Sequence, residues 1–406
     1  YVCTLLARQT GRPVRMEYTR AETFIASKTR HPVRIEIKQG VKNDGTLTGR
    51  QVYYLANTGA YASHAVGITW VGCECLATLY RCQDNLKIEG AAVYTNNPVA
   101  GAFRGFGGVQ AFFALDCQMD EISVALGMDP VDFRLHNAVR DGDLGPAYGV
   151  KVSGDGLSSC LRRGAEEVGW YDRHNQAPPK DQYKKRGWGV GTEMHTSGAF
   201  PAINEQSNAT LKMNEDGTVH LLTGIADLGT GSQTALAQIA AEEMGLGLNA
   251  IRVTSGDTEV VPFDIGAYAS RTVFIGGGAV QQAARHLKDQ LLDLAAARLD
   301  LDPGMLIFDT GRVMVKDNPE DRLSFEELVR GEGSISPRTL IGYSSYEPKV
   351  AYSFGAHFVE VEVDTRTGQI EVKQVTAVHE IGRAVYPKGV EGQIEGGIQQ
   401  GLGHSL

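Results

Sequence analysis

Cysteine is scarce in this sequence, a strong excess of basic charge is missing, and no long apolar run occurs. Only six of the 406 residues are cysteine and none form a C-x-x-C pair, which argues against an iron–sulfur cluster or zinc knuckle in the chain. The formal net charge of −9 gives no excess of basic side chains to neutralise phosphates, which excludes a general nucleic-acid binder. No apolar run approaches the roughly 18 residues of a membrane helix. We therefore expect a globular cytoplasmic protein with reduced thiols.

Glycine, by contrast, is abundant and clustered. The chain has 49 glycines among 406 residues, a share well above the usual roughly 7%. Short runs such as Gly105-Phe106-Gly107-Gly108, Gly229-Thr230-Gly231 and Gly276-Gly277-Gly278 each adjoin a helical or strand pattern. A flexible linker mixes glycine with serine over longer stretches, whereas these runs suit places where the backbone approaches a ligand closely.

The spacing of apolar residues predicts both hairpins and helices. Hairpins are expected where two β-like runs flank a turn signal: residues 33–39 with 47–55, 209–213 with 219–222, and 357–363 with 369–375. Helices are expected over residues 109–126, from Pro130, over 156–168, 233–244 and 279–299, and after a capping box of Ser324 and Glu327. Because strand pairs and helices alternate without a strict βαβ rhythm, the predicted fold class is α+β, with mixed sheets and helices.

The polar, proline-containing segment at residues 171–186 is the best candidate for a domain boundary. We expect a first domain at residues 1–170, a linker at 171–186 and a second domain at 187–406. Residues 1–9 and 394–406 both have a helical pattern at an end of the chain and the first has no N-cap, which indicates a segment of a longer polypeptide.

Two segments share a layout in which a strand ends, a glycine-rich turn follows and a helix begins. One leads from Leu221–Thr223 through Asp227–Gly231, and the other from Tyr94 through Gly101–Gly108. Helix N-termini expose unpaired N–H groups and a partial positive charge, so each turn is a candidate anion site. The second is not a dinucleotide fingerprint, because the G-x-G-x-x-G spacing is missing. By spacing alone, a tight turn with Arg104 at the surface is the plainer interpretation.

The wider sequence changes that interpretation, because a series of motifs resembles one family in order along nearly the whole chain. The segment Thr95-Asn96-Asn97-Pro98 followed by Gly101–Gln110 closely resembles the one that molybdenum hydroxylases place around their molybdenum. The other matching motifs are Gly11–Val14, Arg30–Pro32, Asp227–Thr234, Gly266–Arg271, Gly382 with Tyr386-Pro387, and Gly392–Gly397 with Gln400-Gly401 and Gly403. The chain thus resembles the molybdopterin-binding subunit of this family, which includes xanthine dehydrogenase and aldehyde oxidoreductase.

The resemblance implies a molybdenum–molybdopterin cofactor, with the cytosine dinucleotide as one candidate form, and no direct protein ligand to the metal. Backbone and hydroxyl donors at small residues would hold the pterin and its phosphate, and an amide would contact the pterin edge. The implied cofactor residues are Arg104, Gly229, Thr230, Gly231, Ser232, Ala269, Ser270, Thr272 and Gln393.

The resemblance also implies substrate contacts at Phe106, Phe200 and Tyr268, although core packing is an alternative role for Phe106. Thr230 and Tyr268 differ from the residues usual in xanthine dehydrogenases, and residues 70–76 lack the arginine that those enzymes use on purines, so xanthine is not the expected substrate. The copper-binding cysteine of carbon monoxide dehydrogenases is absent as well. The general-base glutamate of the family is expected beyond Leu406, so no catalytic residue is assigned within the segment.

The activity implied for the complete protein is hydroxylation of an N-heterocycle or aldehyde with water as the oxygen source. Electrons would leave through [2Fe-2S] clusters to FAD, both on partner subunits or outside the segment, in a dimer of heteromers. Two alternatives stay open: a reductase of an aromatic coenzyme A thioester, such as 4-hydroxybenzoyl-CoA, from the same family, and a non-catalytic cofactor-binding or assembly protein. No nucleic-acid or membrane partner is expected.

Histidines and lone carboxylates give no further site by spacing. The histidines, including His195, His357 and His379, form no H-x-x-x-H or H-E-x-x-H pattern. Asp227 and Glu193 are interpreted as isolated carboxylates, and His379 as a structural residue at a strand end.

Overall fold

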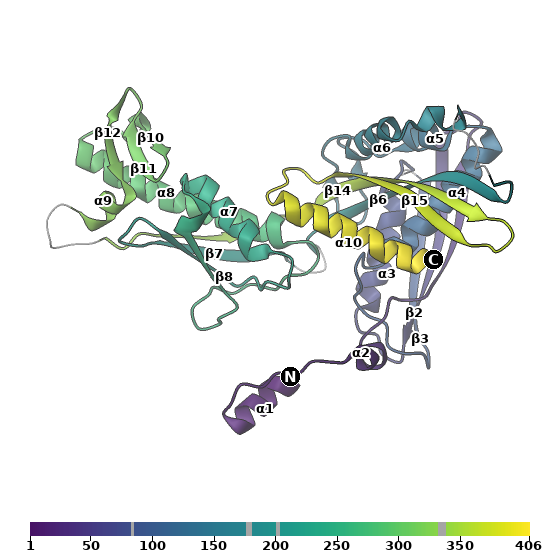
Figure 1. Ribbon diagram of the computed structural model, residues 1–406, viewed down its shortest axis with the longest axis horizontal. Coiled ribbons are helices and arrows are strands. Elements are labelled where there is room, and N and C mark those ends of the chain that lie inside the picture. Colours follow the sequence, from purple (N-terminus) through teal and green to yellow (C-terminus); the bar gives the residue numbers. More distant parts are fainter. Residues whose placement is uncertain (83–84, 176–180, 200–203, 332–337) are drawn as a thin grey trace. The chain divides into compact units, whose positions relative to one another are not determined.

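The computed structural model describes residues 1–82, 85–175, 181–199, 204–331 and 338–406, and the chain divides into two compact units (Figure 1). Unit 1 is Tyr1–Met128 and unit 2 is Asp129–Leu406. The predicted linker at residues 171–186 falls inside unit 2, where Trp170–Asn175 form a 3-10 helix. The role of residues 171–186 as a boundary between domains stays a prediction. None of the helices described is both long and apolar enough to cross a membrane.

Unit 1 is a three-stranded sheet with two helices packed on it. The strand order is β1-β2-β3, with β1 and β2 antiparallel and β2 and β3 parallel. Helix α3 connects the parallel strands and packs against both of them and against α4, which also contacts β1. The elements of unit 1 are α1 (Val2–Thr10), α2 (Arg20–Ala26), β1 (Val33–Val41), β2 (Leu47–Gly59), α3 (Ala65–Thr78), β3 (Leu86–Tyr94) and α4 (Gly108–Leu126).

Glycine allows α3 to lie directly on the sheet of unit 1. A Cβ on Gly72 would come 2.7 Å from the ring of Tyr54, a fully buried side chain of β2. A Cβ on Gly90 of β3 would come 2.7 Å from Thr69 of the same helix. Native interiors are packed too densely to absorb such atoms without a shift, so these glycines set the distance between helix and sheet.

The larger core of unit 2 lies between a four-stranded sheet, β13-β7-β8-β9, and the helices α7 and α8. Strands β8 and β9 are parallel and are joined through α7, whereas the other two pairings are antiparallel. Helix α8 lies so close to β13 that a Cβ on Gly342 would come 2.0 Å from the carbonyl oxygen of Ala283. The elements are β7 (Ser207–Met213), β8 (Val219–Thr223), α7 (Ser232–Met244), β9 (Ile251–Ser255), α8 (Gly277–Leu299) and β13 (Ile341–Tyr346).

A second sheet of unit 2, β15-β14-β6, is antiparallel and packs against α6. Gly164 of α6 leaves room for the buried ring of Phe358, which a Cβ would approach to 2.2 Å. The remaining elements of unit 2 are α5 (Pro130–Asn137), β4 (Leu144–Gly145), β5 (Val150–Lys151), α6 (Gly156–Glu167), β6 (Lys184–Ser197), β10 (Leu306–Asp309), β11 (Arg312–Val315), β12 (Asn318–Ser324), α9 (Phe325–Arg330), β14 (Ala351–Asp364), β15 (Ile370–Glu380) and α10 (Pro387–Ser405).

The predicted α+β class is confirmed, as are the three hairpins and the main helices, within a few residues at their ends. Asp129 caps α5 with Pro130 at its first position, and Ser324 and Glu327 form the expected capping box. The parallel pairs β2–β3 and β8–β9, each joined through a helix, are two βαβ units that the sequence analysis did not expect.

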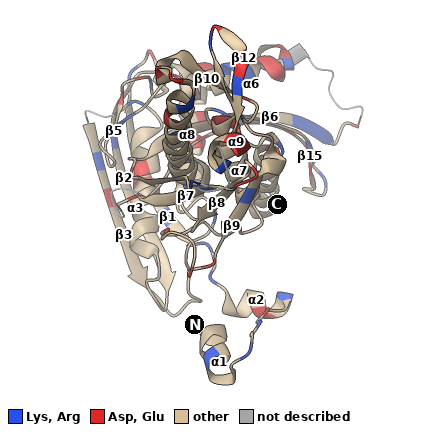
Figure 2. Ribbon diagram, turned by 90° about the vertical axis from the view of Figure 1, so that its left-hand side faces the viewer, with Lys and Arg blue, Asp and Glu red and all other residues tan. Residues whose placement is uncertain are grey.

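Acidic and basic residues are interspersed along the ribbon (Figure 2). At the start of β6, Lys184 and Arg186 pair with Glu362 of β14 at 2.7 Å and 3.1 Å. These two basic side chains are therefore paired within the sheet.

Candidate cofactor site

In unit 1, the loop before α4 has a backbone that only glycine adopts freely. Gly105, Phe106 and Gly107 have φ angles of +92°, +44° and +98°. A Cβ on Gly107 would come 2.3 Å from the carbonyl oxygen of Ile68, so the loop lies directly on α3. Left-handed conformations at residues other than glycine are uncommon and are concentrated at binding sites. The predicted residue Phe106 thus occupies a strained position at the N-terminus of α4.

Arg30 and α3 hold the two predicted residues of this loop. Arg30 donates a hydrogen bond to the carbonyl oxygen of Arg104 at 2.7 Å, and its guanidinium lies 4.5 Å from the ring centre of Phe103. The Arg104 residue itself is exposed. The half-buried ring of Phe106 lies against Gly67 and makes an edge contact with His64, with ring centres 6.2 Å apart. Packing against α3 fixes the ring while leaving part of it accessible.

In unit 2, the Gly229–Ser232 turn stands at the N-terminus of α7. Gly229 and Gly231 have φ angles of +92° and +75°, and Gly231 is the N-cap. Gly229 and Thr230 are exposed, and a Cβ on Gly229 would meet nothing within 4 Å. Ser232 is buried, and its Oγ makes no hydrogen bond of regular geometry. The turn therefore offers open space next to helix N–H groups and hydroxyls, as an anionic ligand requires.

Asp227 is part of this turn, so the interpretation of Asp227 as an isolated carboxylate is wrong. It accepts hydrogen bonds from the backbone N–H groups of Gly229 and Gln233, at 2.8 Å and 3.4 Å. The bond from Gly229, with contributions from Gln233, Gly231 and Ser232, holds the pKa of Asp227 below its usual value. Its negative charge complements the N-terminus of α7.

The start of α10 lies over the same turn. A Cβ on Gly231 would come 3.0 Å from the ring of Tyr386, the residue that precedes α10, and Arg383 pairs with Glu242 of α7 at 2.7 Å. Gln393, the predicted amide contact, lies on α10 and is exposed. The structure thus brings the segment that leads into the Gln393 helix against the Gly229–Ser232 turn. Sequence reasoning gave Tyr386 no role in this contact.

The second predicted cradle, Ala269 to Thr272, contains two successive left-handed residues. Ala269 and Ser270 have φ angles of +47° and +53°. Ser270 and Tyr268 are exposed, whereas Thr272 is half-buried and begins a π-helix, Thr272–Gly276, that continues into α8. Consecutive positive φ angles at alanine and serine are costly, at about 1–2 kcal/mol each, and they persist only where the surrounding structure enforces them.

Arg271 supplies that enforcement, and sequence reasoning missed its role. Its side chain is fully buried and pairs with Glu205 at 2.8 Å and Asp264 at 2.7 Å, both also fully buried side chains. It also donates to the carbonyl oxygens of Gly266, at 2.8 Å, and Gln206. The guanidinium thus binds two carboxylates and two carbonyl oxygens. These bonds fix the turn against Glu205 and Gln206 and against the segment 264–266 that precedes it.

The segments next to the two cradles of unit 2 pack against each other. A Cβ on Gly224, between β8 and the first turn, would come 2.5 Å from the carbonyl oxygen of Pro262 and 2.7 Å from Asp264. A Cβ on Gly276 of the π-helix would come 2.0 Å from the side chain of Ile225. The open glycine turn, the buried hydroxyl of Ser232 and the strained Ser270 turn fit a bound pterin phosphate, which needs closely approached backbone and hydroxyl donors.

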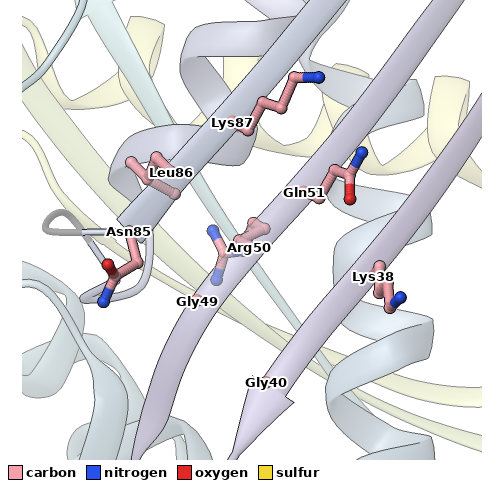
Figure 3. A pocket seen from close by; sticks show the side chains of 8 residues that line it. All are labelled: Lys38, Gly40, Gly49, Arg50, Gln51, Asn85, Leu86 and Lys87. Carbon is pink, nitrogen blue, oxygen red and sulfur yellow. The ribbon is translucent and has the colours of Figure 1, made fainter.

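Three further points concern residues outside the cradles. Phe200, the third predicted substrate contact, lies outside the described residues. Glu193 is not isolated: its carboxylate lies 3.2 Å from Nδ1 of His379. A cavity of about 370 Å³ in unit 1 is lined by none of the predicted residues. Figure 3 shows its lining on three adjacent strands, namely Lys38, Gly40, Gly49, Arg50, Gln51, Asn85, Leu86 and Lys87.

Comparison with known families matches both halves of the chain. Two family models described as "Molybdopterin cofactor-binding domain" match residues 163–406 and residues 1–138. The putative xanthine dehydrogenase molybdenum-binding subunit XdhA of Escherichia coli K12 is 36% identical over 99% of this chain and 54% of its own length. The nicotine 6-hydroxylase large subunit of Paenarthrobacter nicotinovorans is 28% identical over 99% of this chain and 52% of its own length.

A solved structure of a related enzyme has the same fold. Quinoline 2-oxidoreductase from Pseudomonas putida 86 superposes with a TM-score of 0.88 at 26% identity, covering 98% of this chain and 53% of that one. The chain spans about half the length of the relatives cited here. With two molybdopterin cofactor-binding domains matched in order and a close relative among molybdenum-binding subunits, the chain belongs to the molybdenum hydroxylase family of xanthine dehydrogenase and aldehyde oxidoreductase.

Proposed function

We propose that this chain holds the molybdopterin cofactor of an enzyme that hydroxylates an N-heterocycle. The observation that carries the proposal is the pair of cradles in unit 2, one open and rich in donors, the other strained and fixed by Arg271. The substrate class is supported by the relatives, whose names include a nicotine hydroxylase and a quinoline oxidoreductase. An aldehyde is the second substrate class, since an aldehyde oxidoreductase is also among them.

Bound here, the cofactor would supply two-electron oxidation of a carbon, with water as the source of the inserted oxygen. The residues of this chain bind and orient. The hydroxyls of Thr230, Ser232 and Ser270 would donate to the pterin and its phosphate, and Gln393 would contact the pterin edge through its amide. In unit 1, the strained loop from Arg104 to Gly107 would contribute to cofactor binding, and the ring of Phe106 would form an apolar wall for a flat substrate.

The complete protein requires parts that these residues do not supply. We propose that the general-base glutamate lies outside the segment, that [2Fe-2S] clusters and FAD on partner subunits or further domains take up the electrons, and that the assembly is a dimer of heteromers in the cytoplasm. The cytosine dinucleotide is the proposed form of the cofactor, and the turn at the N-terminus of α7 would face the phosphate that the cofactor carries with or without the nucleotide.

Turnover of the complete complex in ¹⁸O-labelled water tests this function. The purified complex would be given quinoline- and nicotine-like heterocycles or an aldehyde with an artificial electron acceptor, or an aromatic coenzyme A thioester with a low-potential reductant. Products would be analysed by mass spectrometry. We expect one labelled oxygen per product from a heterocycle. Ring reduction of the thioester without incorporation of oxygen would establish the reductase instead. A cofactor-loaded complex that turns over none of these compounds would support a binding or assembly protein.

A further inference from the structure

Three adjacent strands of unit 2 carry a cluster of one carboxylate and two imidazoles that the cofactor cradles do not include. In the antiparallel register, Gly355 of β14 pairs with Glu193 of β6 on one side and with His379 of β15 on the other. His357 is two residues from Gly355 on β14, so all three side chains lie on the same face of the sheet.

Glycine at position 355 makes the cluster possible. A Cβ there would come 2.7 Å from Oε1 of Glu193 and 2.9 Å from Nδ1 of His379. With no side chain on the central strand, the carboxylate and the imidazole reach each other across β14. Such close approach of flanking side chains is a recognised reason for glycine within a strand.

The contacts form a chain of three groups. Oε1 of Glu193 lies 3.2 Å from Nδ1 of His379, and Nε2 of His379 lies 3.0 Å from Nε2 of His357. One donor atom of each residue lies within 4.8 Å of the other two. The side chain of His379 is 15% exposed and that of Glu193 46% exposed, so the Glu193 end of the cluster lies at the surface of the described residues.

The groups of this cluster shift one another's pKa values. Burial raises the pKa of Glu193, but the hydrogen bond from His379 and the charges of His357, His379 and His195 outweigh this effect and leave the pKa below its usual value. Burial lowers the pKa of His357, against a smaller opposing effect of Glu193. His195, on the same face of β6, points Nδ1 at the carbonyl oxygen of Thr196 at 2.6 Å.

We propose that His357, His379 and Glu193 form a site for a divalent transition-metal ion of the zinc class, separate from the molybdopterin residues. The two Nε2 atoms are the protein ligands, and water would complete the four positions that such an ion takes. On a tetrahedral ion, two nitrogens each about 2.0–2.1 Å from the metal are roughly 3.3 Å apart, close to the 3.0 Å between these atoms. Glu193 accepts the Nδ1 proton of His379 and so presents the Nε2 lone pair to the ion, the usual role of a carboxylate behind a zinc-bound histidine.

Titration of the metal-free full chain with Zn²⁺ by isothermal calorimetry tests this site, using protein from a host grown without molybdate. We expect one ion per chain. His357→Ala and His379→Ala should each weaken binding by at least about 100-fold, and Glu193→Gln by about 10- to 100-fold. His286→Ala removes an exposed histidine on α8 and should leave the affinity unchanged. Co²⁺ in place of Zn²⁺ should give the visible absorption of tetrahedral coordination in the unaltered chain and in His286→Ala, and lose it in His357→Ala and His379→Ala.

The proposal is overturned if the unaltered chain binds no Zn²⁺, or if the His357→Ala, His379→Ala double variant binds it as tightly as the unaltered chain. The three groups would then be a hydrogen-bonded chain only. His357→Asn is the second variant, because it removes the ligand nitrogen but keeps a polar side chain. Its far-ultraviolet circular dichroism and urea midpoint would show that lost binding is not lost folding.

Discussion

The guanidinium of Arg271 lies 2.8 Å from the carboxylate of Glu205, and both side chains are fully buried. Asp264 pairs with the same guanidinium at 2.7 Å. Buried charges are tolerated only when they are paired and hydrogen-bonded, because water no longer solvates them. This ion pair therefore connects the strained Ala269–Ser270 turn to the start of β7 and explains how the turn keeps its conformation.

Removal of Arg271 is expected to be strongly destabilising. Arg271→Met leaves two buried carboxylates without their partner and should lower the free energy of unfolding by about 3–5 kcal/mol. Arg285→Met is the matched control, since Arg285 pairs with Glu243 at the surface, and it should cost less than about 1 kcal/mol. Urea unfolding of the two variants checks this. Equal losses would show that the buried pair does not hold the fold.

The Ser270→Gly variant removes the hydroxyl of the second cradle and keeps the backbone conformation of the turn. Glycine adopts a φ of +53° without strain, so the free energy of unfolding should change by less than about 1 kcal/mol. The hydroxyl is lost, however, and the complete protein should retain less molybdopterin after gel filtration. Asp300→Gly, at a φ of +55° after α8, is the control and should retain the cofactor fully. Equal retention in both variants would remove Ser270 from the site.

Gly107 should tolerate no side chain. Alanine there would have to keep a φ of +98° and place its Cβ 2.3 Å from a backbone oxygen of α3. Gly127, at the C-terminus of α4, also has a positive φ, but a Cβ there meets nothing within 4 Å. Gly127→Ala should cost about 1 kcal/mol, and Gly107→Ala at least about 2 kcal/mol more. Thermal unfolding of both variants measures the difference, and similar costs would contradict the close approach.

Asp129 should make stability depend on pH. Burial raises its pKa, but hydrogen bonds from Arg173, Trp170 and the N–H of Val131 outweigh this effect, so the pKa lies below the usual value. A carboxyl with a lowered pKa stabilises the fold above its unfolded-state pKa of about 3.9 and loses this effect as the pH falls through the folded-state value. The destabilisation by Asp129→Asn should therefore be full at pH 7 and shrink as the pH falls below about 4.

Urea unfolding between pH 7 and pH 3 measures that dependence. Asp172→Asn, in the 3-10 helix that carries Trp170, is the control and should change the free energy of unfolding by less than about 0.5 kcal/mol throughout. A destabilisation by Asp129→Asn that stays constant over this range would contradict the assigned pKa direction.

Local signals predicted the elements that depend on local chemistry. Asp129 with Pro130, and Ser324 with Glu327, mark helix starts through their own hydrogen bonds, so neighbouring residues suffice to find them. Helix α3 was not predicted, because residues 65–78 are apolar on most sides and show no amphipathic period. The parallel pairing of β2 with β3 depends on the packing of that helix, which no local pattern encodes.

The candidate site divides in the same way. Motif resemblance identified the turns at Gly229 and Ser270, whose glycines and hydroxyls are contiguous in sequence. The contact of Glu193 with His379 joins residues 186 positions apart, and only the register of three strands brings them together. The anchoring of Arg271 by Glu205, 66 residues away, is likewise a tertiary contact.

The most direct measurement is the molybdenum, iron and released nucleotide content of the complete protein, purified from a host supplied with molybdate. The account predicts about one molybdenum per copy of this chain, with iron present and a cytidine nucleotide released. Protein without molybdenum, from a host that loads a control molybdenum enzyme, would contradict it.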